Sequence, residues 1–251
     1  MSRHWSLFWA LTRTEFRLRD QGTVLGFLWT LLSPVFHFLI LYSLFTRWMG
    51  PLLANYPSYL LVGLIQWNFF ATATAGGLTS LRRKAALVSN FSFPRIIVAL
   101  SSVAAIFLSH LLEWALVLAA LIFMGETPSL SWLSLPVLLA AELTLAAGVS
   151  CVLSLMFLPL RDLERVWSIF LYGAFFATPV FYSPEILSPG GRLLVAANPV
   201  ASIIESTRGA LFTGLAPGGA PFWGAVTLAL VLGAAATAGF RRWDGEVAER
   251  L

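Results

Sequence analysis

Six long windows of the sequence contain almost no charged residue, and this feature constrains the fold more than any other. Each window supplies the roughly 20 apolar residues that a helix needs to cross the hydrocarbon core of a bilayer. Of the 251 residues, 58% are hydrophobic and 11% are charged, whereas about 25% are charged in an ordinary soluble domain. A soluble globule of this composition would lack the polar residues to cover its surface. Soluble enzymes, disordered chains and secreted disulfide scaffolds are therefore excluded, and an integral membrane protein is predicted.

The same windows make the expected fold class all-α, with six transmembrane helices. Because an unpaired ion in hydrocarbon is costly, we place the ends of the spans at the flanking charges. The predicted spans are 25–46, 57–78, 97–122, 133–158, 165–182 and 221–240. No linker is long enough to separate domains, so we expect residues 1–251 to form a single domain.

The basic residues predict the orientation of these spans. An even number of spans puts both termini on one side, and thirteen of the sixteen Lys and Arg residues fall on that side. The other side receives only Arg47, Arg192 and Arg208. Because basic residues are enriched in cytoplasmic loops, both termini are predicted to be cytoplasmic. The basic balance of the chain then reflects topology, and no nucleic-acid partner is expected.

The N-terminal segment 4–20 predicts an amphipathic helix at the membrane interface. On a helical wheel, one apolar ridge contains Trp5 and Trp9, another contains Leu7 and Leu11, and charges lie between them. Those charges interrupt any apolar core and exclude a signal peptide. A short frayed tail remains the alternative interpretation.

Residue patterns for catalysis are missing from the sequence. The only lysine, Lys84, has no glycine-rich loop before it, so the chain contains no phosphate-binding loop for ATP. There is neither an HExxH nor a GxSxG pattern, and the three histidines lie in separate segments. We therefore expect no catalytic residue, bound metal or cofactor in this chain, and any ATP would be handled by a partner.

The loop between the second and third spans is the first candidate for function. A short helix from about 80 to 90 would place a basic cluster at the lipid headgroups, and a Phe-Pro turn would lead into the next span. The positive-inside rule alone explains the charges, but exposed aromatics at Phe91 and Phe93 favour docking onto another protein. The candidate residues are Arg82, Arg83, Lys84, Asn90, Phe91, Phe93, Pro94 and Arg95.

The segment 183–212 is the second candidate, and it predicts a re-entrant hairpin on the outer side. We expect a short helix to begin at Ser183-Pro184 and to break at Pro189-Gly190-Gly191. A second helix would begin with Asn198 as N-cap and Pro199 in its first turn, and Gly214 would cap its end. Two helices too short to span the bilayer would then dip in from outside, covered by protein or a water-filled cavity. A loop lying on the membrane surface is the alternative.

Glu113 and Glu142 interrupt two apolar windows and form the third candidate. Counted from the ends of their helices, both lie at a similar depth, and His110 is one turn from Glu113 on the same face. The two acids could share a proton or line a polar path. Structural hydrogen bonding between helices is the equal alternative.

Five sequence motifs, in order along the chain, resemble the membrane subunit of ABC-2 type exporters of O-antigen, capsular or teichoic-acid polysaccharides. Each occurs at the place expected in a six-span map. They are Leu25-Gly26-Phe27-Leu28-Trp29-Thr30-Leu31-Leu32-Ser33-Pro34, Phe93-Pro94-Arg95, Arg161-Asp162-Leu163, Thr178-Pro179-Val180-Phe181-Tyr182, and Asn198-Pro199 followed by Arg208. The chain departs from the family at Asn90 and Val247, where a lysine and an aromatic residue are common.

The resemblance implies a permease without its own ATP site, which exports a lipid-linked polysaccharide across the bacterial inner membrane. It implies a homodimer, membrane lipids around it, and two copies of a separate ABC ATPase that bind ATP and Mg²⁺. The loop from Arg82 to Arg95 would couple to the ATPase, and Arg161 and Asp162 would form an ion pair at the inner end of the fifth span. The outer gate would contain Thr178, Pro179, Phe181, Tyr182, Pro184, Asn198, Pro199 and Arg208.

Three other interpretations stay open on the sequence alone. An exporter of the same family could carry a drug or a lipid. A proton-coupled secondary transporter could use Glu113 and Glu142, although the absence of an inverted repeat argues mildly against it. A membrane scaffold without transport would leave the cytoplasmic loop and the hairpin unexplained.

Overall fold

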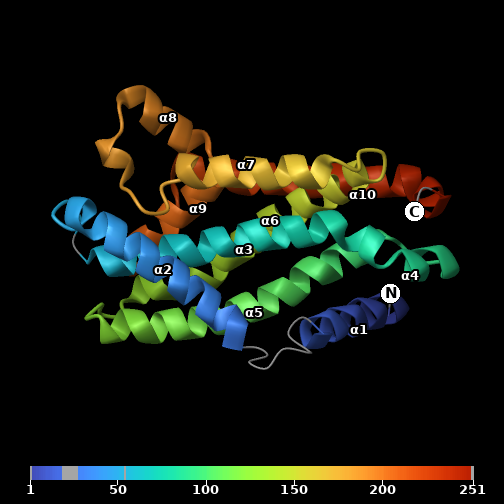
Figure 1. Ribbon diagram of the computed structural model, residues 1–251, viewed down its shortest axis with the longest axis horizontal. Coiled ribbons are helices and arrows are strands. Elements are labelled where there is room, and N and C mark those ends of the chain that lie inside the picture. The colour runs from blue at the N-terminus through green and yellow to red at the C-terminus, as the bar shows by residue number, and fades with distance from the viewer. Residues whose placement is uncertain (1, 19–27, 54, 250–251) are drawn as a thin grey trace.

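The computed structural model describes residues 2–18, 28–53 and 55–249. Within these ranges every regular element is a helix and there is no strand, which confirms the predicted all-α fold for the described part of the chain. The long helices run side by side along one axis of the molecule (Figure 1).

Six long helices lie close to the predicted spans. They are α2 (Leu28–Met49), α3 (Tyr56–Arg83), α5 (Ile96–Phe123), α6 (Leu135–Phe157), α7 (Leu163–Ala177) and α10 (Gly219–Glu249). The start of the first predicted span, residues 25–27, lies outside the described residues. α6 follows directly on a 3-10 turn, η1 (Leu130–Ser134).

The fifth predicted span, 165–182, is wrong at its outer end because α7 ends at Ala177. Proline disfavours helical backbone at the residue before it, and Thr178, which precedes Pro179, has an extended ψ of 135°. The 15 residues of α7 rise only about 22 Å at 1.5 Å per residue, less than the roughly 30 Å of hydrocarbon. Residues 178–182 continue from this short helix as irregular backbone.

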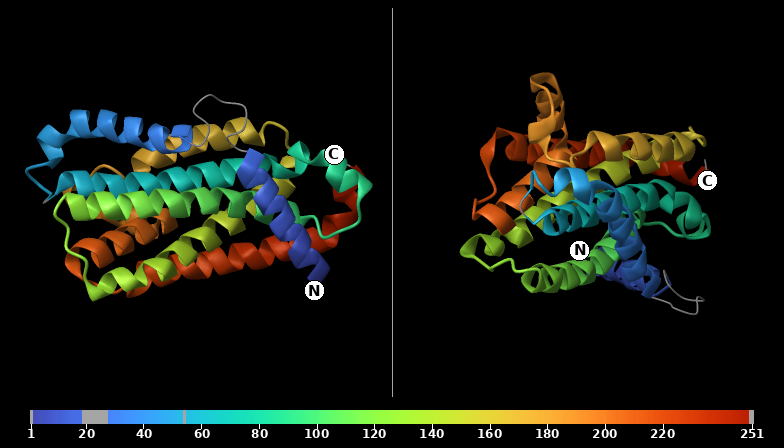
Figure 2. Two further views of the ribbon diagram at one scale, coloured as in Figure 1. Left: turned by 90° about the horizontal axis from the view of Figure 1, so that it is seen from below. Right: turned by 60° about the vertical axis from the view of Figure 1, so that its left-hand side comes forward.

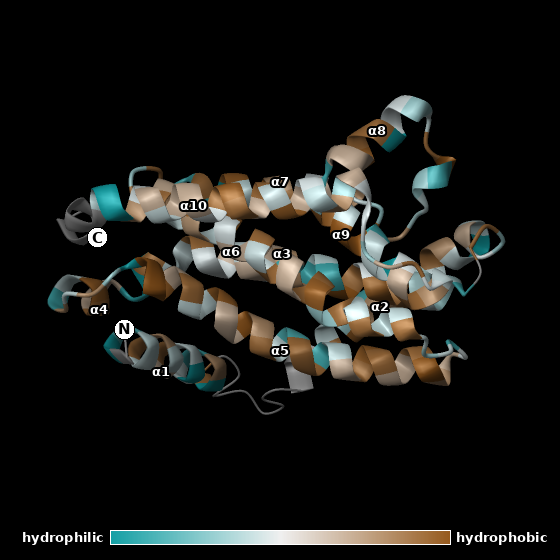
Figure 3. Cartoon of the chain, turned by 180° about the vertical axis from the view of Figure 1, so that it is seen from behind, coloured by the Kyte–Doolittle hydropathy of each residue, from teal (hydrophilic) through white to brown (hydrophobic). Residues whose placement is uncertain are grey.

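Three of the described helical segments are long and apolar enough by themselves to cross a membrane. They are Ile96–Phe123, Leu130–Phe157 and Gly219–Trp243. Figure 3 shows apolar residues along the lengths of the helices and more hydrophilic ones near several of their ends. Length and composition thus identify part of the membrane-embedded bundle directly.

The core of the bundle is built around α3 and α6. α3 packs against α5, α6, α2 and α7, while α6 also packs against α10 (Figure 2). The main apolar cluster includes Leu60 and Leu64 of α3 together with Leu138 and Leu145 of α6, all at most 1% exposed. α7, by contrast, contains no buried residue.

The helix predicted over 4–20 is present as α1 (Ser2–Leu18), and residues 19–20 lie outside the described residues. It packs against α5, at the same end of the molecule as the short helix α4 (Ala85–Asn90) and the C-terminal end of α10 (Figure 1). Its inner face is centred on Thr12, which is fully buried, whereas Trp5 and Trp9 are 61% and 44% exposed. α1 therefore docks through a polar position and keeps its tryptophans outside.

The outer segment has short helices where we expected them, but one boundary is wrong. After the 3-10 turn η2 (Pro184–Ile186), α8 covers Pro189–Ala197, so Pro189-Gly190-Gly191 opens a helix instead of breaking one. Ser188 caps α8 by accepting a hydrogen bond from Gly191 N at 3.3 Å, and Pro189 takes the first turn, where no backbone N–H is needed.

The second helix begins and ends as predicted. Asn198 caps α9 (Pro199–Arg208), a π-helical turn η3 (Gly209–Thr213) follows, and Gly214 ends it in the left-handed conformation at φ 72°. Figure 1 shows α8 standing out from the bundle, while α9 lies against it.

Candidate functional site

Irregular backbone at residues 178–182 is held in place by side chains from α3 and α9. Four successive carbonyl oxygens each accept a hydrogen bond from a side chain. Arg208 Nη1 and Nη2 donate to Pro179 O at 2.6 Å and Val180 O at 2.7 Å. Tyr56 Oη and Tyr59 Oη donate to Phe181 O at 3.0 Å and Tyr182 O at 3.1 Å. Buried backbone carbonyls need hydrogen-bond partners, so these four bonds permit the chain to leave the helix here.

Arg208 is the centre of this arrangement and is 3% exposed. Its Nε and Nη2 donate to Tyr59 O at 3.2 and 2.9 Å, and its Nη1 donates to Glu205 Oε1 at 2.6 Å. The guanidinium carbon also lies 3.4 Å from the centroid of the Tyr59 ring. A planar guanidinium with five donors can serve several carbonyls and one carboxylate at once, which a lysine cannot do.

Asn198 joins the two motif stretches of the predicted outer gate. Its Oδ1 accepts from the backbone of Val200 and Ala201 at 3.0 and 3.3 Å, and its Nδ2 donates to Thr178 Oγ1 at 2.9 Å. One amide thus caps α9 and fixes the residue at which α7 ends. We call Tyr59, Thr178, Asn198, Glu205 and Arg208 the outer cluster.

The other predicted gate residues surround the outer cluster. Pro184 and Pro199 each lie in the first turn of a short helix. Phe181 is 8% exposed and packs against Phe45, with ring centroids 4.5 Å apart. Tyr182 Oη donates to Phe176 O at 3.1 Å. The structure therefore brings together all the motif residues of this region.

Sequence reasoning missed the contribution of α3 to the outer cluster. Tyr56 and Tyr59 resemble ordinary interface aromatics in the sequence, and nothing in their spacing identifies their partners. Gly63 is a clearer signal in the structure, because an added Cβ would lie 2.2 Å from Arg208 Nη2 and 2.6 Å from Val180 O. Only glycine leaves the room that the guanidinium occupies.

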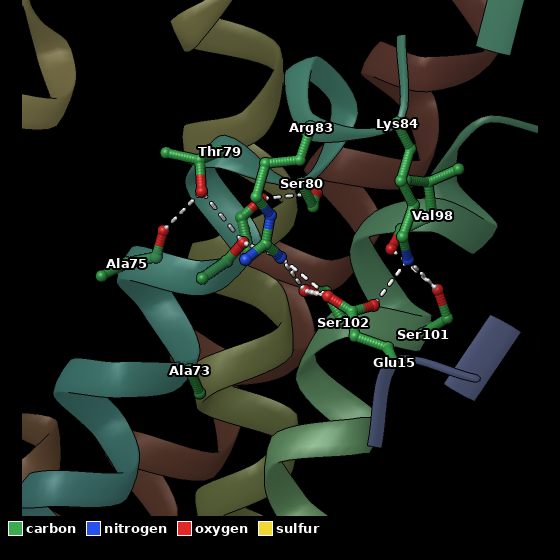
Figure 4. Close-up of polar contacts among 12 residues, drawn as sticks. Glu15, Ala73, Ala75, Thr79, Ser80, Arg83, Lys84, Val98, Ser101 and Ser102 are labelled. Atoms are coloured by element: carbon green, nitrogen blue, oxygen red, sulfur yellow. Dashed lines mark hydrogen bonds and ion pairs between the residues drawn. The ribbon is translucent and has the colours of Figure 1, made fainter. Parts of the chain in front are cut away.

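At the opposite end of the bundle, Glu15 of α1 binds the basic residues Arg83 and Lys84 at the end of α3. Its Oε1 lies 2.7 Å from Arg83 Nη2, and its Oε2 lies 2.5 Å from Lys84 Nζ. Ser102 of α5 donates to the same Oε1 at 2.7 Å (Figure 4). This inner cluster ties α1 to α3 and α5. The sequence showed the charges but not that Glu15 pairs with two of them.

The predicted coupling loop is divided into exposed and buried parts. Phe91 is 62% exposed, as expected, but the expectation that Phe93 is exposed is wrong, since it is 8% exposed and packs with Val88 and Phe240. The Phe93 ring anchors the end of this loop to the bundle, because it packs in an apolar cluster with residues of α5, α6 and α10. Phe91 is thus the large apolar side chain that this loop presents at the surface.

The remaining loop residues have local roles. The Arg82 guanidinium carbon lies 5.9 Å from the centroid of the Phe157 ring. Asn90 Nδ2 donates to Ala86 O at 2.8 Å. Pro94 is exposed, and Arg95 is the N-cap residue of α5.

His110, Glu113 and Glu142 come together as the sequence predicts. His110 Nδ1 lies 3.7 Å from Glu113 Oε2, and His110 Nε2 lies 3.4 Å from Glu142 Oε2. Trp114 Nε1 donates to His110 Nε2 at 2.9 Å, so the indole also contacts this cluster. A cavity of about 180 Å³ borders His110 and Glu113 and also touches His37 and Asn68. The cluster can hold a proton between two helices.

Two further expectations concern ions. Arg161 and Asp162 are both exposed just before α7, and none of the ion pairs between described residues joins them. Within the described ranges, no group of three His, Cys, Asp or Glu residues is placed to hold a metal ion.

Comparison with known proteins places the sequence among transport proteins. The family model for the ABC-2 type transporter matches residues 6–212. Two proteins from Klebsiella pneumoniae, both called O-antigen export system permease protein RfbA, are 30% identical over 206 and 205 residues. These alignments cover 82% and 81% of this chain and 80% and 79% of the relatives. The protein of the same name from Myxococcus xanthus is 29% identical over 244 residues, covering 96% of this chain and 94% of its own.

Proposed function

Because the chain belongs to the ABC-2 type transporter family, and is thus a multi-pass membrane subunit for transport, we propose that it exports a lipid-linked polysaccharide of the O-antigen type. The observation that carries this proposal is the similarity, over nearly the whole chain, to proteins named for O-antigen export. The polymer would leave the cytoplasm across the bacterial inner membrane, driven by ATP hydrolysis in partner subunits.

We propose that residues 1–251 form one transmembrane domain with six spans and cytoplasmic termini. The position of α1, α4 and the end of α10 at one end of the bundle supports this topology (Figure 1). So does the concentration of Lys and Arg at that end. The 178–212 segment then lies at the outer end, where α8 and α9, each too short to span, form a re-entrant gate over the satisfied backbone of residues 178–182.

Family members generally work with an ABC ATPase, and we propose two ATPase copies beneath a homodimer of this chain. α4 and Phe91 would receive the ATPase, since an exposed aromatic directly after a short helix is a natural docking element. The inner cluster would pass a movement of α4 to α1 and α5, because Glu15 bridges these elements. ATP and Mg²⁺ would bind only to the partner.

Co-purification with a candidate ABC ATPase tests the coupling role. We expect the wild type to retain the ATPase and its ATP hydrolysis, and Phe91→Ala to reduce retention severalfold. Phe123→Ala is the matched control, because Phe123 is 93% exposed at the other end of the bundle. If the wild type retains no ATPase under any condition, the proton-coupled alternative replaces this proposal.

Complementation tests the cargo. In a strain whose O-antigen permease gene is deleted, but whose ATPase and glycan synthesis are intact, we expect this chain with its ATPase to restore surface glycan. A complex that hydrolyses ATP and reaches the membrane, yet leaves the glycan inside for every glycan type supplied, would favour the drug or lipid alternative.

A further inference from the structure

A cavity of about 900 Å³ lies between α1, α3 and α5. Most of its wall is apolar and consists of small or aliphatic side chains, including Leu11, Ala71, Ala75 and Ile106. Its charged part is the inner cluster, since Glu15, Arg83 and Lys84 also line it. The cavity therefore combines a hydrocarbon-like wall with a charged end.

The charged end is net positive. One carboxylate, Glu15, faces the two cations Arg83 and Lys84. All the hydrogen bonds that Arg83 makes with described residues use Nη2, which binds Glu15, Gly76 O and Ser102. Its Nε and Nη1 have no acceptor among the described residues, and the side chain is 52% exposed. A ligand with several anionic oxygens would find donors here.

We propose that this cavity binds a lipid that carries a phosphate or diphosphate headgroup, with the headgroup at Arg83 and Lys84. Guanidinium groups bind phosphate through paired donors, and basic pockets between helices at the cytoplasmic side bind anionic headgroups. The hydrocarbon chain would lie along Ala71 and Ala75. A free anion would make no contact with that apolar wall, so the geometry points to a molecule that has both an anionic headgroup and a hydrocarbon chain.

In this arrangement Glu15 both holds α1 against α3 and competes with the lipid headgroup for Arg83 and Lys84. Its carboxylate occupies donors that the phosphate would use, so the two anions exclude each other at Arg83 Nη2 and Lys84 Nζ. Lipid binding would then loosen α1 from α3. If the lipid is the carrier of the cargo, the inference rests on the proposed function; lipid binding itself is measured on the isolated chain and needs neither the ATPase nor transport.

Native mass spectrometry of the full chain in detergent tests this proposal, with dioleoyl phosphatidic acid and dioleoylglycerol as probes. We expect phosphatidic acid to bind at least tenfold more tightly than dioleoylglycerol. The double variant Arg83→Gln/Lys84→Gln should lose this preference, and Glu15→Gln should bind phosphatidic acid more tightly. Equal binding of both probes, or weaker binding by a folded Glu15→Gln, would overturn the proposal.

A second variant tests the apolar wall and keeps every charge. Ala75→Trp fills the cavity and should weaken phosphatidic acid binding severalfold, whereas Ala119→Trp, on the exposed face of α5, should not. Unchanged binding by Ala75→Trp would contradict the inferred position of the chain.

A polyprenyl diphosphate as a third probe separates the two sources of such a lipid. Tighter binding than phosphatidic acid would assign the site to the lipid carrier of the cargo, and weaker binding would assign it to a membrane phospholipid. Displacement of phosphatidic acid by an equal concentration of inorganic phosphate would show that the wall contributes nothing and would overturn the proposal.

Discussion

Gly63 is the residue that lets Arg208 approach α3. A methyl group at this position would overlap Arg208 Nη2 and Val180 O, so the guanidinium would have to leave the carbonyls that it serves. Each buried carbonyl left without a partner costs about 1–3 kcal/mol. We therefore expect Gly63→Ala to reduce the stability of the folded chain by at least about 2 kcal/mol.

Thermal unfolding in detergent measures this loss of stability as a lower melting temperature, reported by labelling of the single cysteine. Cys151 is 2% exposed, so a thiol-reactive fluorogenic dye labels it only as the chain unfolds. Gly173→Ala is the matched control: it lies within α7 and an added Cβ meets nothing within 4 Å. The control should be neutral or stabilising by up to about 1 kcal/mol. Equal melting temperatures for the two variants would contradict the proposed close approach.

A substitution of Glu142 tests whether the buried cluster of His110, Glu113 and Glu142 belongs to the transport path. Because both carboxylate oxygens of Glu142 are buried without a hydrogen-bond partner among the described residues, an amide of nearly the same shape should be accommodated. We expect Glu142→Gln to keep the melting temperature within a few degrees and to leave ATP-driven glycan export unchanged. Lost export with unchanged stability would favour the proton-coupled mechanism.

At the scale of elements, Asn198 holds α7 and α9 together, whereas Ser188 caps only α8. Loss of an N-cap costs about 1 kcal/mol, and Asn198→Ala also removes the bond to Thr178, worth about 1 kcal/mol. We therefore expect Asn198→Ala to lower the melting temperature about twice as much as Ser188→Ala, measured by the same dye assay. A larger effect of Ser188→Ala would show that α8, and not the α7–α9 junction, limits stability.

The long helices were predictable because bilayer thickness and the cost of buried charge fix their positions almost independently of packing. The short helices were harder to predict from the sequence. Pro189 with two glycines reads equally well as a break or as a helix start, and only the cap from Ser188 decides between them. Phe93 shows the same limit, since its burial depends on apolar residues from α10 and α6 that are far away in the sequence.

The residues of the candidate site were predictable from the motifs, but the hydrogen bonds that fix the irregular backbone of residues 178–182 were not. Arg208 and Asn198 stood out in the sequence, but their partners did not: Arg208 binds the carbonyls of Pro179 and Val180, and Asn198 binds the hydroxyl of Thr178. Glu15 was visible only as a charge that interrupts an apolar face. Its pairing with Arg83 and Lys84 requires α1 to fold back across α5, a tertiary arrangement that local periodicity does not encode.

At the scale of the whole molecule, the bundle has an outer end joined by many hydrogen bonds and an inner end joined by ion pairs. The outer cluster fixes the junction of α7, α3 and α9 through many short hydrogen bonds around one buried arginine. The inner cluster joins α1 to α3 and α5 through one carboxylate that is partly accessible. A conformational change driven from the cytoplasmic side would therefore begin where the links are fewest and most exchangeable.

The face of α7 that the chain leaves uncovered is where we expect the homodimer to form. α7 has no buried residue, and Tyr172 near its middle is 74% exposed, without a hydrogen-bond partner among the described residues. A phenol hydroxyl facing hydrocarbon is unfavourable, so this face should meet a partner subunit or a water-filled path. The exposed face of α5 around Leu116 is purely apolar and suits lipid.

Cysteine cross-linking in native membranes distinguishes the two faces. In a Cys151→Ala background we expect Tyr172→Cys to give a cross-linked dimer with a bifunctional maleimide, and Leu116→Cys to stay monomeric. In the proposed topology both positions lie on membrane-spanning helices, and equal reagent access can be checked with a monofunctional maleimide of similar size. A dimer band from Leu116→Cys alone would move the interface to α5, and the uncovered surface of α7 would then face lipid, with its tyrosine reaching toward the headgroups.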